Sequence, residues 1–95
     1  MKKYYHYTDK DPQQFMSSGM WRNTSYTDHG GFGPEEARTK CGIPKPVWVL
    51  EFVDDGGFKE NRPAIVQAVP TRGFIGGARD YIHPGRHIPV TFRKL

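Results

Sequence analysis

A histidine near the start of the chain and an aspartate near its end are the residues best suited to chemistry. His6 lies in a segment rich in aromatic residues, from which its imidazole could point into a cleft, and Thr8 could fix its tautomer by hydrogen bonding. Asp80 stands where a glycine-bearing segment becomes β-favouring, a place where the backbone can hold a carboxylate at a fixed distance from a ligand. We therefore predict a pocket with His6 and Asp80 as its two poles.

The segment before Asp80 contains the adjacent glycines Gly76 and Gly77. Glycine lets the backbone approach a ligand closely, which is typical of a binding loop. The alternative is a structural turn, in which Asp80 caps a hairpin or pairs with Arg79 or Arg86. Both interpretations stay open from this segment alone.

Two further acids compete with Asp80. Glu51 lies inside an apolar run, where burial could raise its pKa, although a surface position at a strand edge explains it more simply. Glu60 is the second competitor.

Short elements must position these residues, because glycine and proline recur along the chain as turn signals. The order of the predicted elements is β-α-β-α-β-β-β-β, which indicates an α+β fold with a small, curved, mostly antiparallel sheet and two short helices. The run at 46–53 is nearly all apolar, so we expect a central strand buried on both faces. The predicted strands are 3–8, 20–26, 46–53, 64–69, 79–82 and 87–92, and the predicted helices are 13–18 and 34–41.

Length, net charge and cysteine content limit the kinds of protein that this chain can be. Ninety-five residues allow one domain, residues 1–95, and the net charge of +4 suits a polyanionic or acidic partner without choosing among them. Cys41 is the single cysteine, so the fold does not depend on an internal disulfide, and we expect the thiol to pack rather than to attack a substrate. No apolar segment is long enough for a membrane span, and we expect no membrane partner.

The order of three motifs resembles the ADP-ribosyltransferase fold. The motifs are His6-Tyr7-Thr8 in a first strand before a short helix, Ser25-Tyr26 in a second strand, and the Gly-Gly-x-x-acid segment that ends at Asp80. The chain looks most like the bacterial polymorphic-toxin transferases with a His-Tyr-Asp signature. The resemblance implies that His6 contacts the ribose of NAD, that Tyr26 stacks on nicotinamide, and that Asp80 stabilises the charge that develops as the glycosidic bond breaks.

The same resemblance extends to cofactor, partners and location. NAD would be the substrate, with Tyr7, Thr8 and Ser25 beside it, and the products would be ADP-ribose on an unknown acceptor or on water. Arginines could bind the pyrophosphate in bidentate fashion. The resemblance implies a cognate immunity protein, which we expect to be acidic. The domain would be a secreted or delivered effector that acts in the cytoplasm of a target cell. The candidate arginines are Arg22, Arg72 and Arg79.

Two other functions compete with NAD chemistry. A small metal-independent ribonuclease toxin would use His6, His83 or His87 as acid and base, with nearby arginines on the phosphate of a nucleic acid. A non-enzymatic basic binding module would instead present exposed aromatic residues such as Trp21 to a partner.

We expect no metal site. His83 and His87 are four residues apart, but Pro84 and Gly85 between them exclude the helical face on which such a pair usually binds a metal. His29 lies beside glycines with no second ligand in register.

Overall fold

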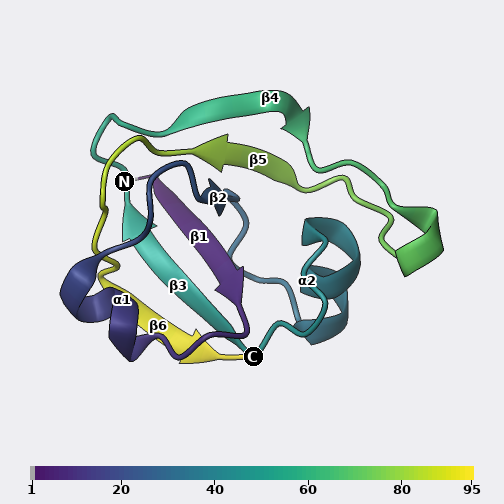
Figure 1. The fold of residues 1–95 in the computed structure, drawn as a ribbon, viewed down its shortest axis with the longest axis horizontal. Helices are drawn as coiled ribbons and strands as arrows, with labels where there is room; N and C mark the ends of the chain where they lie inside the picture. Colours follow the sequence, from purple (N-terminus) through teal and green to yellow (C-terminus); the bar gives the residue numbers. More distant parts are fainter. Residues whose placement is uncertain (1) are drawn as a thin grey trace.

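The computed structural model of the chain describes residues 2–95, in which short strands alternate with two α-helices and one 3₁₀ turn (Figure 1). This arrangement confirms the predicted α+β class. No helix within residues 2–95 has the length and apolar character needed to cross a membrane. The elements are β1 (Lys3–Thr8), α1 (Gln13–Ser18), β2 (Ser25–Tyr26), α2 (Pro34–Cys41), β3 (Trp48–Val53), β4 (Lys59–Ile65), the 3₁₀ turn η1 (Pro70–Arg72), β5 (Arg79–Ile82) and β6 (Thr91–Lys94).

The strands divide into two antiparallel sheets of three strands each, and the prediction of a single curved sheet was wrong. β3 lies between β1 and β6 in the first sheet, and β5 lies between β2 and β4 in the second. Two backbone hydrogen bonds between Tyr5 and Thr27, each 2.8 Å long, join β1 to the residue that follows β2. The two sheets therefore meet along the edge of β1.

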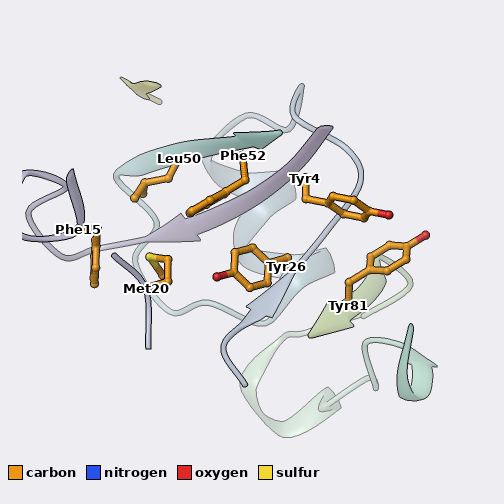
Figure 2. Packing of buried hydrophobic residues seen from close by; sticks show 7 residues of the cluster. All are labelled: Tyr4, Phe15, Met20, Tyr26, Leu50, Phe52 and Tyr81. Atoms are coloured by element: carbon orange, nitrogen blue, oxygen red, sulfur yellow. The ribbon is translucent and has the colours of Figure 1, made fainter. Parts of the chain in front are cut away.

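Buried side chains form one cluster on each face of the first sheet. Leu50 and Phe52 of β3 point into the first cluster, which is rich in aromatic rings (Figure 2). Val49 belongs to the second cluster, together with Ala37 of α2. β3 is thus central and buried on both faces, as its apolar run predicts. The first cluster consists of Tyr4, Phe15, Met20, Tyr26, Leu50, Phe52 and Tyr81, and the second of Tyr7, Phe32, Ala37, Val49 and Ala78.

Both α-helices form where their sequence signals predict them. Before α1, the carboxylate of Asp11 accepts a hydrogen bond from the Gln13 N–H at 3.0 Å, which satisfies one of the free donors at the helix start. α2 begins at Pro34, and Gly42 ends it in the left-handed conformation with φ 72°. Cys41, the last residue of α2, is thereby placed next to β1.

Two strands differ from the sequence prediction for local reasons. β2 is only two residues long because a turn precedes it, in which Asn23 has φ 58° and the Thr24 hydroxyl donates to the Trp21 carbonyl. β4 covers Lys59–Ile65 instead of 64–69. It is an edge strand with mostly exposed side chains, so its sequence lacks the apolar alternation that predicts a strand, and only an edge tolerates Pro63.

The last two strands do not form the expected hairpin. β5 pairs in the second sheet and β6 in the first, so the residues between them cross from one sheet to the other. Two prolines in this connection, Pro84 and Pro89, carry no N–H for a ladder, and the extended pairing begins only at Thr91 instead of at 87.

Gly76 fills a structural role that only glycine can take. It is buried with φ 67°, and a Cβ there would collide with the backbone of Val66 and approach Ala68 N to 2.9 Å. We expect Gly76→Ala to lower the free energy of unfolding by about 2 kcal/mol or more, from backbone strain plus steric conflict. Urea denaturation checks this value against Gly31→Ala, where the nearest atoms belong to the exposed His29 ring. Equal losses in the two variants would contradict the assignment.

Candidate functional site

A cavity of about 180 Å³ lies between β1, β2, the start of β5 and the end of α2. Pockets that hold drug-sized ligands measure about 300–1,000 Å³, so this one can enclose one ring of a larger ligand while the rest lies outside. Apolar side chains, including Ile43 and Val66, form much of its wall. The sequence-predicted residues that line it are His6, Tyr7, Thr8, Ser25, Tyr26, Arg79 and Asp80.

His6 is held at the point where β1 and β2 separate. Backbone hydrogen bonds join Tyr5 to Thr27. At the next residue of β1 the contact with β2 is made by a side chain instead, because Nδ1 of the His6 ring lies 2.7 Å from the Ser25 carbonyl oxygen. Because a carbonyl only accepts hydrogen bonds, Nδ1 carries the proton in the neutral ring, and Nε2 keeps a lone pair. Ser25, rather than Thr8, therefore fixes the tautomer, and the hydroxyl of Thr8 instead accepts from the Lys10 N–H.

Burial lowers the pKa of His6 below its ordinary value of 6.5, and the hydrogen bond to Ser25 offsets this only in part. The folded protein therefore binds this proton less readily than the unfolded chain. As pH falls below 6.5, the native state loses stability relative to the unfolded state. We expect a midpoint below 6.5 when the His6 ring is titrated by NMR, its signal being assigned by its loss in His6→Asn. A midpoint at or above 6.5 would show that burial does not control this group.

Asp80 has a fixed carboxylate in the cavity wall. It is half-buried, and Oδ2 accepts a hydrogen bond of 3.0 Å from the side-chain amide of Asn61 in β4. The second carboxylate oxygen has no hydrogen-bond partner within residues 2–95. The alternative role of a turn cap does not fit, because Asp80 lies inside β5.

Tyr26 does not offer the stacking face that the sequence predicts. Residues opposite one another in antiparallel strands share a face of the sheet, and Tyr26 is opposite Tyr81 of the aromatic cluster. Only 2% of Tyr26 is exposed, and its ring lies beside Phe52 in the aromatic cluster (Figure 2). The ring packs edge-on against Phe52 and Phe58 at centroid distances of 5.0 and 4.9 Å. Tyr26 therefore supports His6, whose ring centroid is 6.0 Å away, from within the core.

Thr27 and Cys41 are among the cavity residues that were not predicted as site residues. Thr27 is 5% exposed, and its hydroxyl has no hydrogen-bond partner within residues 2–95, so a ligand in the cavity could supply one. Cys41 also lines the cavity, and burial raises the pKa of its thiol to about 12, with the charge of Asp80 adding to the effect. The thiol stays protonated at neutral pH, which suits packing rather than nucleophilic attack.

The predicted phosphate-binding residues are mostly elsewhere. Arg72, in η1, is exposed and lies outside the cavity lining, as do Gly76 and Gly77. Gly76 approaches the protein's own backbone instead of a ligand. Arg79 does line the cavity, and its guanidinium lies 3.3 Å from the Tyr81 hydroxyl.

Neither competing acid lines the cavity. Glu51 lies on the first sheet and forms an ion pair of 3.2 Å with Lys3. Glu60 is 59% exposed at its side chain and lies 3.6 Å from Arg79. Among the three candidates, only Asp80 lines the cavity.

The connection between β5 and β6 brings His83 and His87 together without a helix. Their rings stack with centroids 5.0 Å apart, and Asp55 lies beside them. His83 is 7% exposed, with the Gly85 N–H donating to Nδ1 and Asp55 at Nε2. A ribonuclease would need histidine nitrogens free to exchange protons with RNA, which His83 lacks in this arrangement.

No family model, no curated protein and no solved structure matches the chain. The interpretation of the site therefore rests on its geometry and on the chemistry of its side chains.

Proposed function

We propose that the chain is an enzyme that cleaves the nicotinamide–ribose bond of NAD, transferring ADP-ribose to an acceptor or to water. The observation that carries this proposal is the joint placement of His6 and Asp80 in the wall of one cavity. These two residues come from β1 in one sheet and β5 in the other, and each is anchored by a separate hydrogen bond.

The carboxylate of Asp80 would act on the reacting bond. Departure of nicotinamide leaves positive charge on the ribose, and a fixed carboxylate stabilises that charge most where water is excluded. The amide of Asn61 holds one oxygen at 3.0 Å, which leaves the other for the ribose. Asp80 therefore has the chemistry and the fixed position that bond cleavage requires.

His6 and the apolar wall would position the substrate. Neutral His6 presents a lone pair at Nε2, which can accept a hydrogen bond from a ribose hydroxyl. Ile43 and Val66 provide apolar contact for the nicotinamide ring, in place of the stacking first expected from Tyr26. Arg79, whose side chain is more than half exposed, can contact the pyrophosphate if its ion pair with Glu60 breaks.

The direct test is incubation of the purified chain with NAD, followed by NMR detection of free nicotinamide. We expect nicotinamide release, with ADP-ribose as the second product when water is the only acceptor. Degradation of total RNA without loss of NAD would overturn the proposal in favour of the ribonuclease, and so would the absence of any nicotinamide release.

The biological setting that we propose is that of a toxin delivered into the cytoplasm of a target cell. A domain that depletes NAD would harm its own producer, so a cognate immunity protein should bind it. The net charge of +4 favours an acidic partner. Expression of the chain inside a cell should arrest growth, and expression of the neighbouring gene should restore it.

A further inference from the structure

A second group of possible ligand atoms lies where the turn after β3 meets the connection between β5 and β6. Asp55 belongs to that turn, and His83 and His87 belong to the connection. The planes of the two imidazole rings are within 11° of parallel. With the Asp55 carboxylate they offer three ligand atoms that all lie within 4.8 Å of one another. These three residues are outside the lining of the cavity described above.

His87 faces the carboxylate with a nitrogen that carries no proton. Its Nε2–H donates to the Val53 carbonyl oxygen at 2.9 Å, so the lone pair of the neutral ring is on Nδ1. Nδ1 lies 3.9 Å from Oδ2 of Asp55, and both atoms are acceptors. A cation between them would satisfy both. A histidine whose far nitrogen donates to a backbone carbonyl is also the usual arrangement of a metal ligand.

His83 is the third residue of the group, and its ring must give up present hydrogen bonds before it can bind a metal. Its Nε2 lies 3.0 Å from each oxygen of Asp55, and the Gly85 N–H donates to its Nδ1 at 3.0 Å. Nε2 therefore holds the proton in the neutral ring. For Nε2 to bind a metal, this proton must move to Nδ1, and the hydrogen bond that Nδ1 accepts from the Gly85 N–H must break. The chain fits closely around this ring, because a Cβ at Gly57 would lie 2.5 Å from Nε2.

The spacing suits a small tetrahedral ion. Ligand atoms about 2.0–2.2 Å from Zn²⁺ in a tetrahedral arrangement are about 3.3 Å from one another. The separations from Asp55 to His83 and to His87, 3.0 and 3.9 Å, bracket that value. Two imidazoles and one carboxylate favour Zn²⁺ and its neighbours over Mg²⁺ or Ca²⁺, which prefer oxygen ligands. The Asp55 side chain is 45% exposed, so an ion and its water can enter.

We propose that Asp55, His83 and His87 bind a divalent transition-metal ion of the Zn²⁺ type. The ion would fasten the turn after β3 to the connection between β5 and β6, and so hold the two sheets together at a distance from the cavity. This proposal is independent of NAD chemistry, because it concerns other residues.

The test uses the full chain treated with EDTA and then titrated with zinc sulfate by calorimetry. We expect one ion per chain and a rise in melting temperature of about 5 °C or more at saturation. Asp55→Asn and His87→Gln should each abolish this binding, whereas His29→Gln and Cys41→Ser should leave it unchanged. Circular dichroism establishes that each variant is folded.

Two results would overturn the proposal. The first is the absence of zinc binding by the folded parent chain. The second is zinc binding that persists in both Asp55→Asn and His87→Gln but disappears in Cys41→Ser or His29→Gln, which would place the ion elsewhere. Magnesium chloride serves as the matched control ion and should leave the melting temperature unchanged.

Discussion

Asp80→Asn is expected to slow nicotinamide release about 100-fold or more, since removal of one preorganised electrostatic group from a reaction centre typically has an effect of this size. Asparagine has nearly the shape of aspartate, and its carbonyl oxygen can still accept the hydrogen bond from Asn61, which measures 3.0 Å in the native protein. The negative charge, however, is lost. The change should therefore appear mainly in kcat, with KM for NAD altered much less.

Glu60→Gln is the matched control for that experiment. It also removes one carboxylate, from the neighbouring strand β4, but from a side chain that is 59% exposed and outside the cavity lining. Its kcat should stay close to that of the parent chain. If Asp80→Asn kept full activity, Asp80 would not be the charge-stabilising group; the proposed NAD cleavage would then be tested separately by nicotinamide release from the parent.

The largest expected effect on stability comes from Phe52→Ala. Phe52 is fully buried in β3 and lies beside Tyr26 (Figure 2). The centroid of its ring is 5.0 Å from that of Tyr26 and 5.5 Å from that of His87. Truncating a buried phenylalanine costs about 3–5 kcal/mol, because apolar contact is lost and a cavity remains. In a domain of this size that is a large share of the total stability. Urea denaturation followed by circular dichroism measures the loss.

Ile75→Ala provides the comparison for Phe52→Ala. Ile75 is also a large apolar residue, but 65% of it is exposed, so its truncation should change the free energy of unfolding by less than about 0.5 kcal/mol. Similar losses in the two variants would mean that the aromatic cluster around β3 does not dominate the stability of the fold.

Strong local signals made part of this fold predictable. The apolar run of β3 and the proline and glycine that bound α2 determine their elements through burial and backbone geometry within a few residues. β4 has no such signal, because an edge strand with exposed side chains needs no apolar alternation. The division into two sheets was likewise hidden, since it depends on which strands pair rather than on where they begin.

The sequence led to several residues that line the cavity, but not to the orientation of their side chains. The order of His6 and Asp80 along the chain led to two residues that share a cavity wall. The direction of Tyr26 depends on the two-residue strand β2, where one step in register exchanges core and surface. Thr27 and Asp55 carry no sequence signal of their own, because their surroundings arise only from tertiary contacts.

The cavity lies at the junction between the two sheets, with lining residues from both. Tyr5 and Thr27 form two backbone hydrogen bonds there, and the ring of the next residue, His6, donates a hydrogen bond to the Ser25 carbonyl. Motion of one sheet against the other would therefore change the distance between His6 in β1 and Asp80 in β5, and with it the shape of the cavity. A ligand that contacts both sheets would restrict their relative motion, so binding in the cavity would also make the whole domain more rigid.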